Sequence, residues 1–191
     1  MNVIETDIPG VLIIEPDVFA DERGYFEETY RLARYRDLGL PDFVQDNISY
    51  SKPAGTLRGL HYQIAPYTQG KLVSVIVGEV FDVALDIRRD SPTFGKHVSV
   101  ILSAENHRQF YIPEGFAHVM LTTKPNTIFS YKCTNVYSKE HERGIYWNDP
   151  ALGIDWPMRE GLTVLEKDQQ HPTLASLEAD PVRWEELRFG E

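Results

Sequence analysis

Apolar residues fall in short runs along most of the chain, and turn-forming residues separate these runs. Residues 80–87 alternate between apolar positions and polar or small ones, which is the two-residue period of a half-buried strand. Residues 72–77 form another apolar run just before it, and Gly78-Glu79 between the two is a tight-turn pattern. The pattern therefore predicts two strands joined by a tight turn.

The same signals continue toward the C-terminal half. Residues 98–102 repeat the alternation, and a turn at residues 113–115 leads into the apolar run 116–121. Residues 128–133 form one more strand-like run. Because so many short strands occur, the sequence predicts an all-β sandwich or barrel, and the pattern alone leaves the topology open.

Helical signals are few. The best candidate is residues 29–38, which Gly39 and Pro41 would end, and a second is expected near residues 178–187. The chain has no internal repeat, low-complexity stretch or interdomain linker. At 191 residues it fits one domain, with or without a short tail.

Composition narrows the class of protein. Hydrophobic residues make up 42% of the chain, which suits a globular protein with a substantial core, and no apolar run reaches membrane-spanning length. The N-terminus lacks a basic stretch followed by an apolar one, so we expect no signal peptide. The one cysteine, Cys133, has no partner for an internal disulfide, and a cytoplasmic location is expected.

The formal net charge of −10 argues against nucleic acid or an anionic membrane as a partner, because both bind to broad basic surfaces. A small anion is compatible with this charge. A nucleotide diphosphate needs only a few arginine, lysine or backbone N–H groups that converge in a pocket.

Candidate chemistry is densest in residues 56–63, read TLRGLHYQ, and in the QGK that follows at 69–71. Taken singly, His61 would usually be a structural histidine, Arg58 a solvated charge and Lys71 a strand-edge lysine. In a flat strand Arg58 and His61 would face opposite sides. A shared pocket therefore requires a twist or bulge, which Gly59 would permit.

At this point the chain resembles the dTDP-4-dehydrorhamnose 3,5-epimerase family over roughly residues 8–172. The blocks that carry the resemblance occur in the family's order: DERGYF at 21–26, QDN at 45–47, LRGLHYQ at 57–63, GKLV at 70–73, FDVALDIR at 81–88, SPTFG at 91–95, IPEGFAH at 112–118, YKC at 131–133, WNDP at 147–150 and IDWP at 154–157. The resemblance implies a cupin-like jelly roll, a double-stranded β-helix with short flanking helices. It further implies one domain over residues 1–191 and a homodimer that exchanges N-terminal segments, with residues 173–191 left as a C-terminal tail.

The family's chemistry requires three kinds of group. A hydrogen beside a ketone is very weakly acidic, so the site needs a base, a cation or donor at the ketone oxygen, and a second group that returns a proton from the opposite face. The resemblance implies His61 as the base, oriented by Asp168, with Lys71 stabilising the enolate and Tyr131 as the opposing acid. Without the resemblance, we would interpret Asp168 as part of a solvated loop and Tyr131 as a core residue.

The resemblance also implies a set of substrate contacts. Arg23 and Glu28 would hold the nucleotide from the exchanged segment, and Phe26 would pack on its base. Arg58 would bind a phosphate or sugar oxygen, and Tyr137 would stack on the base or serve in packing. The full expected set is Arg23, Phe26, Glu28, Gln45, Asn47, Arg58, His118, Tyr137, Glu142 and Lys167.

The sequence departs from the family at a few positions. Val119 and Met120 stand where the family commonly has glycine and phenylalanine, beside His118. Ser74 replaces a frequent arginine, and residues 48–54 lack the usual basic residues. These changes leave open which sugar binds and how many carbons are inverted.

The sequence leaves four candidate functions for this protein. The first is 3,5-epimerisation of dTDP-4-dehydro-6-deoxy-D-glucose to dTDP-4-dehydro-L-rhamnose by a homodimer that uses no metal or cofactor. The second inverts a single centre of a related dTDP-4-keto-deoxysugar, and the third is a non-catalytic sugar-nucleotide binding protein. A metal-dependent cupin is disfavoured, because Tyr62-Gln63 follows His61 where a second histidine would stand.

Overall fold

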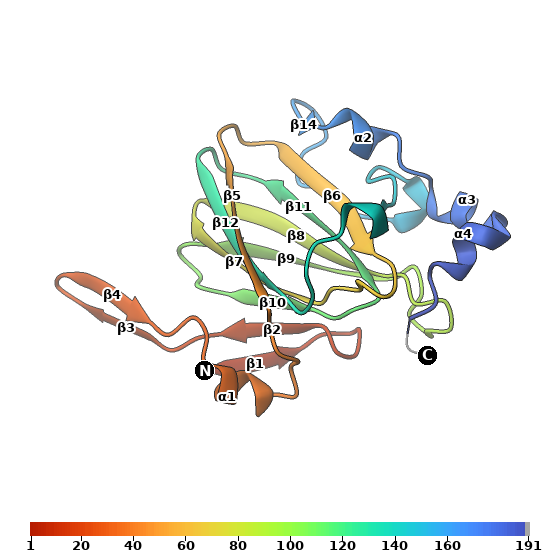
Figure 1. The fold of residues 1–191 in the computed structure, drawn as a ribbon. Coiled ribbons are helices and arrows are strands. Elements are labelled where there is room, and N and C mark those ends of the chain that lie inside the picture. Colours follow the sequence, from red (N-terminus) through yellow and green to blue (C-terminus); the bar gives the residue numbers. More distant parts are fainter. Residues whose placement is uncertain (190–191) are drawn as a thin grey trace.

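Two antiparallel β-sheets packed against each other form the body of the molecule in the computed structural model, which describes residues 1–189 (Figure 1). The first sheet has the strand order β1 (Asn2–Glu5), β2 (Leu12–Glu15), β10 (Gln109–Ile112), β7 (Lys71–Val77), β12 (Thr127–Cys133) and β5 (Gln45–Ser51). The second has the order β13 (Glu142–Gly144), β6 (Thr56–Gln63), β11 (Phe116–Thr122), β8 (Glu79–Asp86) and β9 (His97–Ser103), and β14 (Thr163–Val164) adds to β6 in parallel. This is the jelly roll that the resemblance implies.

The strand positions follow the predicted runs, but their pairing does not follow chain order. β7 and β8 are joined at Gly78 and lie in different sheets. Gly78 has φ +85°, a conformation that favours glycine, and a Cβ there would overlap Thr127. The predicted turn therefore connects the two layers of the fold.

The strand at residues 80–87 was predicted to have one buried face, and both of its faces are buried. Val83 and Leu85 pack into an outer core on the far side of the second sheet, whereas Val80 and Ala84 face the inner core between the sheets. The prediction was wrong on this point because the face of Asp82 and Ala84, which the alternation assigned to solvent, packs against the first sheet. On the inner side this leaves Asp82 fully buried.

The same alternation sorts the residues of β11. Val119 belongs to the outer core, whereas Met120 and Phe116 face the inner one. Val119 and Met120 are the two departures from the family beside His118. Of these two residues, only Met120 therefore faces the inner core between the sheets. His118 is buried on that same inner side.

The C-terminal residues form short helices: α2 (Glu166–Gln169), α3 (Leu174–Ala179) and α4 (Pro181–Glu185). A single helix near residues 178–187 was predicted, but Asp180 separates two helices. Asp180 precedes a proline, which disfavours helical backbone, and its side chain caps α4. Leu177 and Leu187 pack into the outer core, which gives this segment a structural role.

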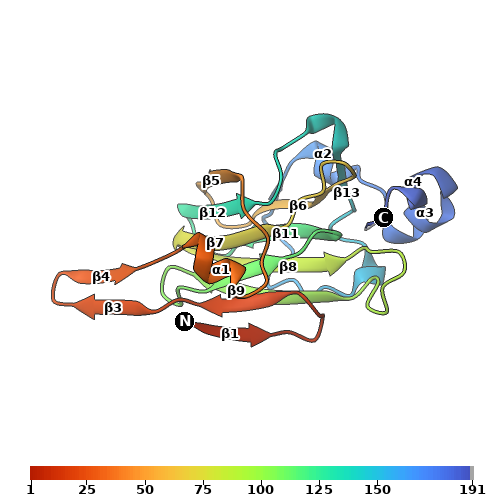
Figure 2. The same cartoon turned by 60° about the horizontal axis from the view of Figure 1, so that its bottom comes forward.

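The N-terminal region carries α1 (Leu32–Arg36), shorter than the predicted 29–38, and a hairpin of β3 (Val18–Asp21) and β4 (Gly24–Glu27). Figures 1 and 2 show this hairpin projecting away from the two sheets. It exposes aromatic side chains, including Phe26 at 67%. Within residues 1–189 no helix has both the length and the apolar character needed to cross a membrane.

Candidate active site

Two adjoining cavities open between the sheets, with volumes of about 380 and 230 Å³. Three predicted catalytic residues line both of them: His61 from β6, Lys71 from β7 and Tyr131 from β12. Asp168 lines the smaller cavity from α2. The fold thus brings together residues from four elements, β6, β7, β12 and α2.

A β-bulge in β6 places Arg58 and His61 on the same side. His61 pairs with His118 and Arg58 pairs with Met120, so three steps along β6 match two along β11. Gly59 lies in this bulge at φ +125°, and a Cβ there would overlap the His118 carbonyl oxygen. Arg58 and His61 both line the smaller cavity, so the geometric requirement stated from the sequence is met.

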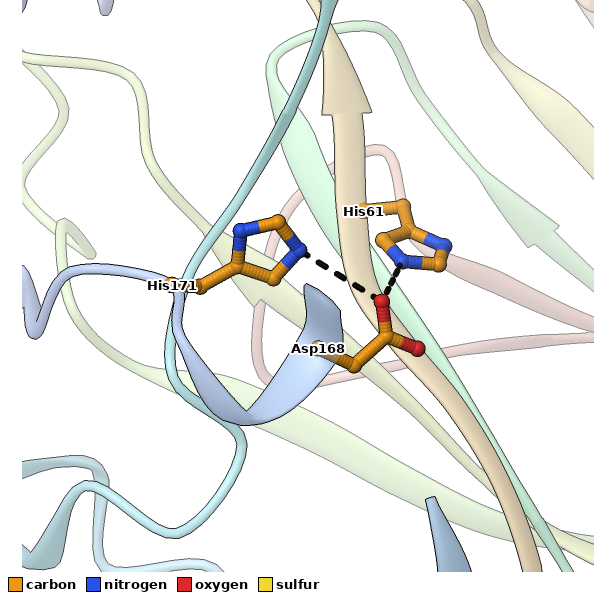
Figure 3. A group of neighbouring side chains, drawn as sticks. All are labelled: His61, Asp168 and His171. Carbon is orange, nitrogen blue, oxygen red and sulfur yellow. Dashed lines mark hydrogen bonds and ion pairs between the residues drawn. The ribbon is translucent and has the colours of Figure 1, made fainter. Parts of the chain in front are cut away.

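His61 and Asp168 form a short hydrogen bond, with 2.7 Å between His61 Nε2 and Asp168 Oδ1 (Figure 3). The Asp168 side chain is only 1% exposed, so the solvated-loop interpretation of Asp168 was wrong. Burial acts to raise the Asp168 pKa, but contacts with His171 and His61 and the Gly59 N–H outweigh it and hold the pKa well below its ordinary value.

An ionised Asp168 accepts the hydrogen bond, so the proton of neutral His61 lies on Nε2. Nδ1 then carries the lone pair that can accept a proton. The carboxylate also stabilises the imidazolium that forms when Nδ1 takes that proton. The pair is arranged for general-base chemistry.

Lys71 forms no ion pair with any residue in the range 1–189 and lines both cavities. Burial lowers the Lys71 pKa, and the nearby Cys133, Asp82 and Glu142 partly offset that effect. A partly desolvated ammonium gains more from a negative charge placed beside it than a hydrated one does. Lys71 can therefore stabilise an oxyanion that develops in the cavity.

Tyr131 belongs to the first sheet, whereas His61 belongs to the second, so the two side chains flank the cavity from different layers. Burial raises the Tyr131 pKa, with a smaller contribution from Cys133, and the phenol therefore stays protonated at neutral pH. Tyr131 can supply a proton to the face of a bound molecule that His61 does not reach.

His118 is buried and places Nε2 3.0 Å from both carboxylate oxygens of Asp82. Burial lowers the His118 pKa, and Asp82 partly opposes this. Asp82 was not among the predicted site residues. The alternation of its strand indicated a solvent-facing position, and only the burial of both strand faces reveals its role beneath His118.

A chain of polar contacts lines the mouth of the larger cavity. Gln45 donates to Asn47 and accepts from the Tyr137 backbone N–H. The Tyr137 hydroxyl donates to Glu142 at 3.3 Å, and Lys167 Nζ lies 3.1 Å from the same oxygen. The structure thus gathers all five of these predicted binding residues around one opening.

Three predicted binding residues lie elsewhere. Arg23 pairs with Asp21 at the tip of the projecting hairpin, and Phe26 is exposed on β4. Glu28 forms ion pairs with two arginines near α1. Within one chain, therefore, the fold does not bring Arg23, Phe26 or Glu28 into the cavity that the other residues line.

His61, Asp168 and His171 offer donor atoms within 4.8 Å of one another, the one such group of three among residues 1–189. Bond lengths to zinc place neighbouring ligand atoms roughly 3.3 Å apart in a tetrahedral site. The 2.7 Å separation of His61 Nε2 and Asp168 Oδ1 is shorter and corresponds to a hydrogen bond. The His61–Asp168 contact therefore has the geometry of a hydrogen bond rather than that of two ligands on one metal ion.

Comparison with known proteins gives a consistent result. The family model described as dTDP-4-dehydrorhamnose 3,5-epimerase matches residues 5–176. A dTDP-4-dehydrorhamnose 3,5-epimerase from Shigella flexneri is 57% identical over 164 residues, which cover 85% of this chain and 90% of that protein.

Solved structures agree. A dTDP-6-deoxy-D-glucose-3,5-epimerase from Legionella pneumophila, in complex with dTDP-4-keto-L-rhamnose, superposes with a TM-score of 0.91 at 49% identity, over 100% of this chain and 99% of that one. A 3'-monoepimerase from Streptomyces bikiniensis, in complex with dTDP-quinovose, gives 0.84 at 31% identity, over 95% and 94%. This chain belongs to the dTDP-4-dehydrorhamnose 3,5-epimerase family.

Proposed function

We propose that this enzyme converts dTDP-4-dehydro-6-deoxy-D-glucose to dTDP-4-dehydro-L-rhamnose by inverting C3 and C5. The observation that carries the proposal is the His61–Asp168 hydrogen bond of 2.7 Å in a cavity that Lys71 and Tyr131 also line. These are the base, the oxyanion stabiliser and the opposing acid that epimerisation beside a ketone requires.

The reaction begins when His61 Nδ1 takes the hydrogen from a carbon beside the C4 ketone. The electron pair of that C–H bond moves to the ketone oxygen, and the Lys71 ammonium stabilises the resulting enolate. Asp168 stabilises the imidazolium at the same time. No redox change occurs in this step.

Inversion follows when Tyr131 donates its hydroxyl proton to the opposite face of the carbon and the ketone reforms. Tyr131 is left as a phenolate and His61 as an imidazolium, so the solvent returns a proton to one and removes a proton from the other. The same proton-transfer steps then take place at the second carbon. Because the Tyr131 hydroxyl regains its proton from water, the reaction places solvent hydrogen at each inverted centre.

The remaining cavity residues bind the substrate. Arg58 offers charge-assisted hydrogen bonds to a phosphate or sugar oxygen, and His118, held by Asp82, contacts the sugar. Tyr137 is about half exposed at the cavity mouth, where its ring can stack on the nucleobase. Further polar contacts come from Gln45, Asn47, Glu142 and Lys167.

We further propose a homodimer of single-domain subunits, 1–191, in which the hairpin of one copy reaches the cavity of the other. Arg23, Phe26 and Glu28 would then complete the nucleotide site. This proposal is supported by the aromatic side chains that the hairpin exposes, among them Phe19 and Phe26. Burying them in a dimer interface would remove apolar surface from water, which is favourable. Sedimentation equilibrium should give twice the chain mass, and a monomer would contradict the arrangement.

A cytoplasmic location fits a chain with a single cysteine. The runner-up function is inversion of one centre only. It is favoured by the likeness to a 3'-monoepimerase and by Met120 in the cavity, where the family commonly has phenylalanine.

One NMR experiment separates the two functions. Incubation with dTDP-4-dehydro-6-deoxy-D-glucose in deuterated water should place deuterium at C3 and at C5 and give the L-configured product. Deuterium and inversion at one carbon alone would favour the single-centre enzyme. Binding of dTDP without any exchange would indicate a non-catalytic protein, and loss of activity after exhaustive chelation would point to a metal-dependent cupin.

A further inference from the structure

A second imidazole lies against the His61–Asp168 pair. His171 follows α2 and places Nε2 3.5 Å from Asp168 Oδ1, the same oxygen that His61 contacts (Figure 3). The His61 and His171 rings lie edge to face, with centroids 5.8 Å apart and an interplanar angle of 86°. One carboxylate oxygen thus lies between two histidines.

The His171 nitrogen needs an explanation. Its Nε2 is buried and has no hydrogen-bond partner of ordinary geometry within residues 1–189. Such atoms are rare in folded proteins because a buried polar group without a partner costs free energy. Among residues 1–189, the one ion-pair contact of this nitrogen is with Asp168.

The surrounding chain holds the His171 ring in this position. Gly144 lies directly opposite His61 in the pairing of β13 with β6, and a Cβ on Gly144 would overlap the His171 ring. Directly after His171, the Pro172 carbonyl accepts a hydrogen bond of 2.8 Å from the Tyr146 N–H. The ring therefore fills a space that only glycine leaves open beside the base.

We propose that His171 is a positioning residue for catalysis, which shares the Asp168 oxygen with His61 and so limits how strongly that carboxylate holds a proton on His61. The proposal rests on the proposed function, in which His61 must be neutral to act as the base. A protonated His171 Nε2, 3.5 Å from Asp168 Oδ1, places positive partial charge beside the carboxylate and so reduces the negative potential that His61 experiences. His171 thereby keeps His61 available as a base at lower pH.

Other charged groups also face the pair. Lys71 approaches from β7, His118 from β11, Lys167 from α2 and Glu142 from β13, and Arg58 lines the same cavity. None of these groups is substituted when only residue 171 is changed. A difference between variants at residue 171 therefore isolates the contribution of His171.

The test compares His171→Phe, which keeps a ring but removes the N–H donor, with His171→Gln, which keeps a donor. The first readout is the NMR titration of the His61 imidazole signals in the substrate-free protein, and the second is the pH profile of kcat/KM. In His171→Phe we expect the titration midpoint and the acid limb to move to higher pH by about one unit. In His171→Gln both should stay near the wild-type values.

Unmoved midpoints in His171→Phe, or an equal displacement in His171→Gln, would overturn the proposal and leave His171 with a packing role. If the phenylalanine ring prevents folding, His171→Leu supplies the donor-free variant for the same measurement. The titration is made without substrate, so it tests His171 even if the wild-type protein exchanges no deuterium. A wild-type protein that exchanges no deuterium would instead refute the proposed function.

Discussion

Replacing Asp168 with asparagine tests how much catalysis depends on the carboxylate that orients His61. The side chain keeps its shape and loses its charge. The Gly59 N–H donates to Oδ2 at 3.4 Å, so the amide oxygen of the variant should stay on that side. The NH₂ group then occupies the place of Oδ1, 2.7 Å from His61 Nε2, and can only donate.

This geometry reverses the tautomer of the imidazole. His61 Nε2 must accept the hydrogen bond, so the proton moves to Nδ1, the nitrogen that should take hydrogen from the sugar. The same carboxylate-to-amide change in a catalytic triad lowers kcat by about 10⁴. We expect a loss of between roughly 10³ and 10⁴ here, which corresponds to about 4 to 5.5 kcal/mol of transition-state stabilisation.

The assay is the initial rate of deuterium incorporation at each carbon of the 4-keto sugar, followed by NMR, with dTDP affinity measured in parallel. Asp168→Asn should bind dTDP nearly as well as the wild type, because Asp168 is buried behind His61. Asp155→Asn is the matched control, since Asp155 is exposed and lies outside both cavities. An Asp168→Asn rate within about tenfold of wild type would refute the tautomer argument.

Three further predictions follow from the same site. Lys71→Met should lower kcat by about 10² to 10³ with little change in KM, because the lost Lys71 ammonium acts on charge that develops only in the transition state. An unchanged kcat in steady-state assays would remove Lys71 from the mechanism. Tyr131→Phe should still exchange deuterium through His61 but lose net inversion by about 10² or more, which chiral analysis of the product checks, and equal losses of exchange and inversion would contradict the division of roles. The stability that Asp168 contributes should be present above the ordinary carboxyl pKa and be lost as pH falls below it, because its folded-state pKa is lowered. Denaturant unfolding should therefore show the wild-type advantage over Asp168→Asn shrinking below about pH 4, and a constant difference would argue against the lowered pKa.

Local pattern predicted the strands but could not predict which strands pair. The alternation in residues 80–87 correctly identified β8, yet β7 and β8 lie in different sheets although only Gly78 separates them. Pairing depends on contacts between residues distant in sequence, such as His61 with His118. Glycine at position 59 was the one local sign of the bulge that brings Arg58 and His61 together.

The site residues also depend on contacts between distant parts of the chain, which local sequence pattern does not reveal. Asp168 lies 107 residues from His61 and reads as an ordinary charged position, so only the family resemblance suggested it before the structure was known. Asp82 was missed because the alternation of its strand assigns its face to solvent, whereas that face packs against the first sheet. His171 gave no signal at all, since its importance comes from a shared carboxylate oxygen and from the space left by Gly144.

The proposed mechanism gives one imidazole, that of His61, the role of removing the hydrogens at both carbons beside the ketone. It is tested most directly by comparing wild type and His61→Ala in deuterated water with dTDP-4-dehydro-6-deoxy-D-glucose. We expect label at C3 and C5 with the wild type, and dTDP binding without label at either carbon with His61→Ala. Labelling by His61→Ala at the wild-type rate would contradict it.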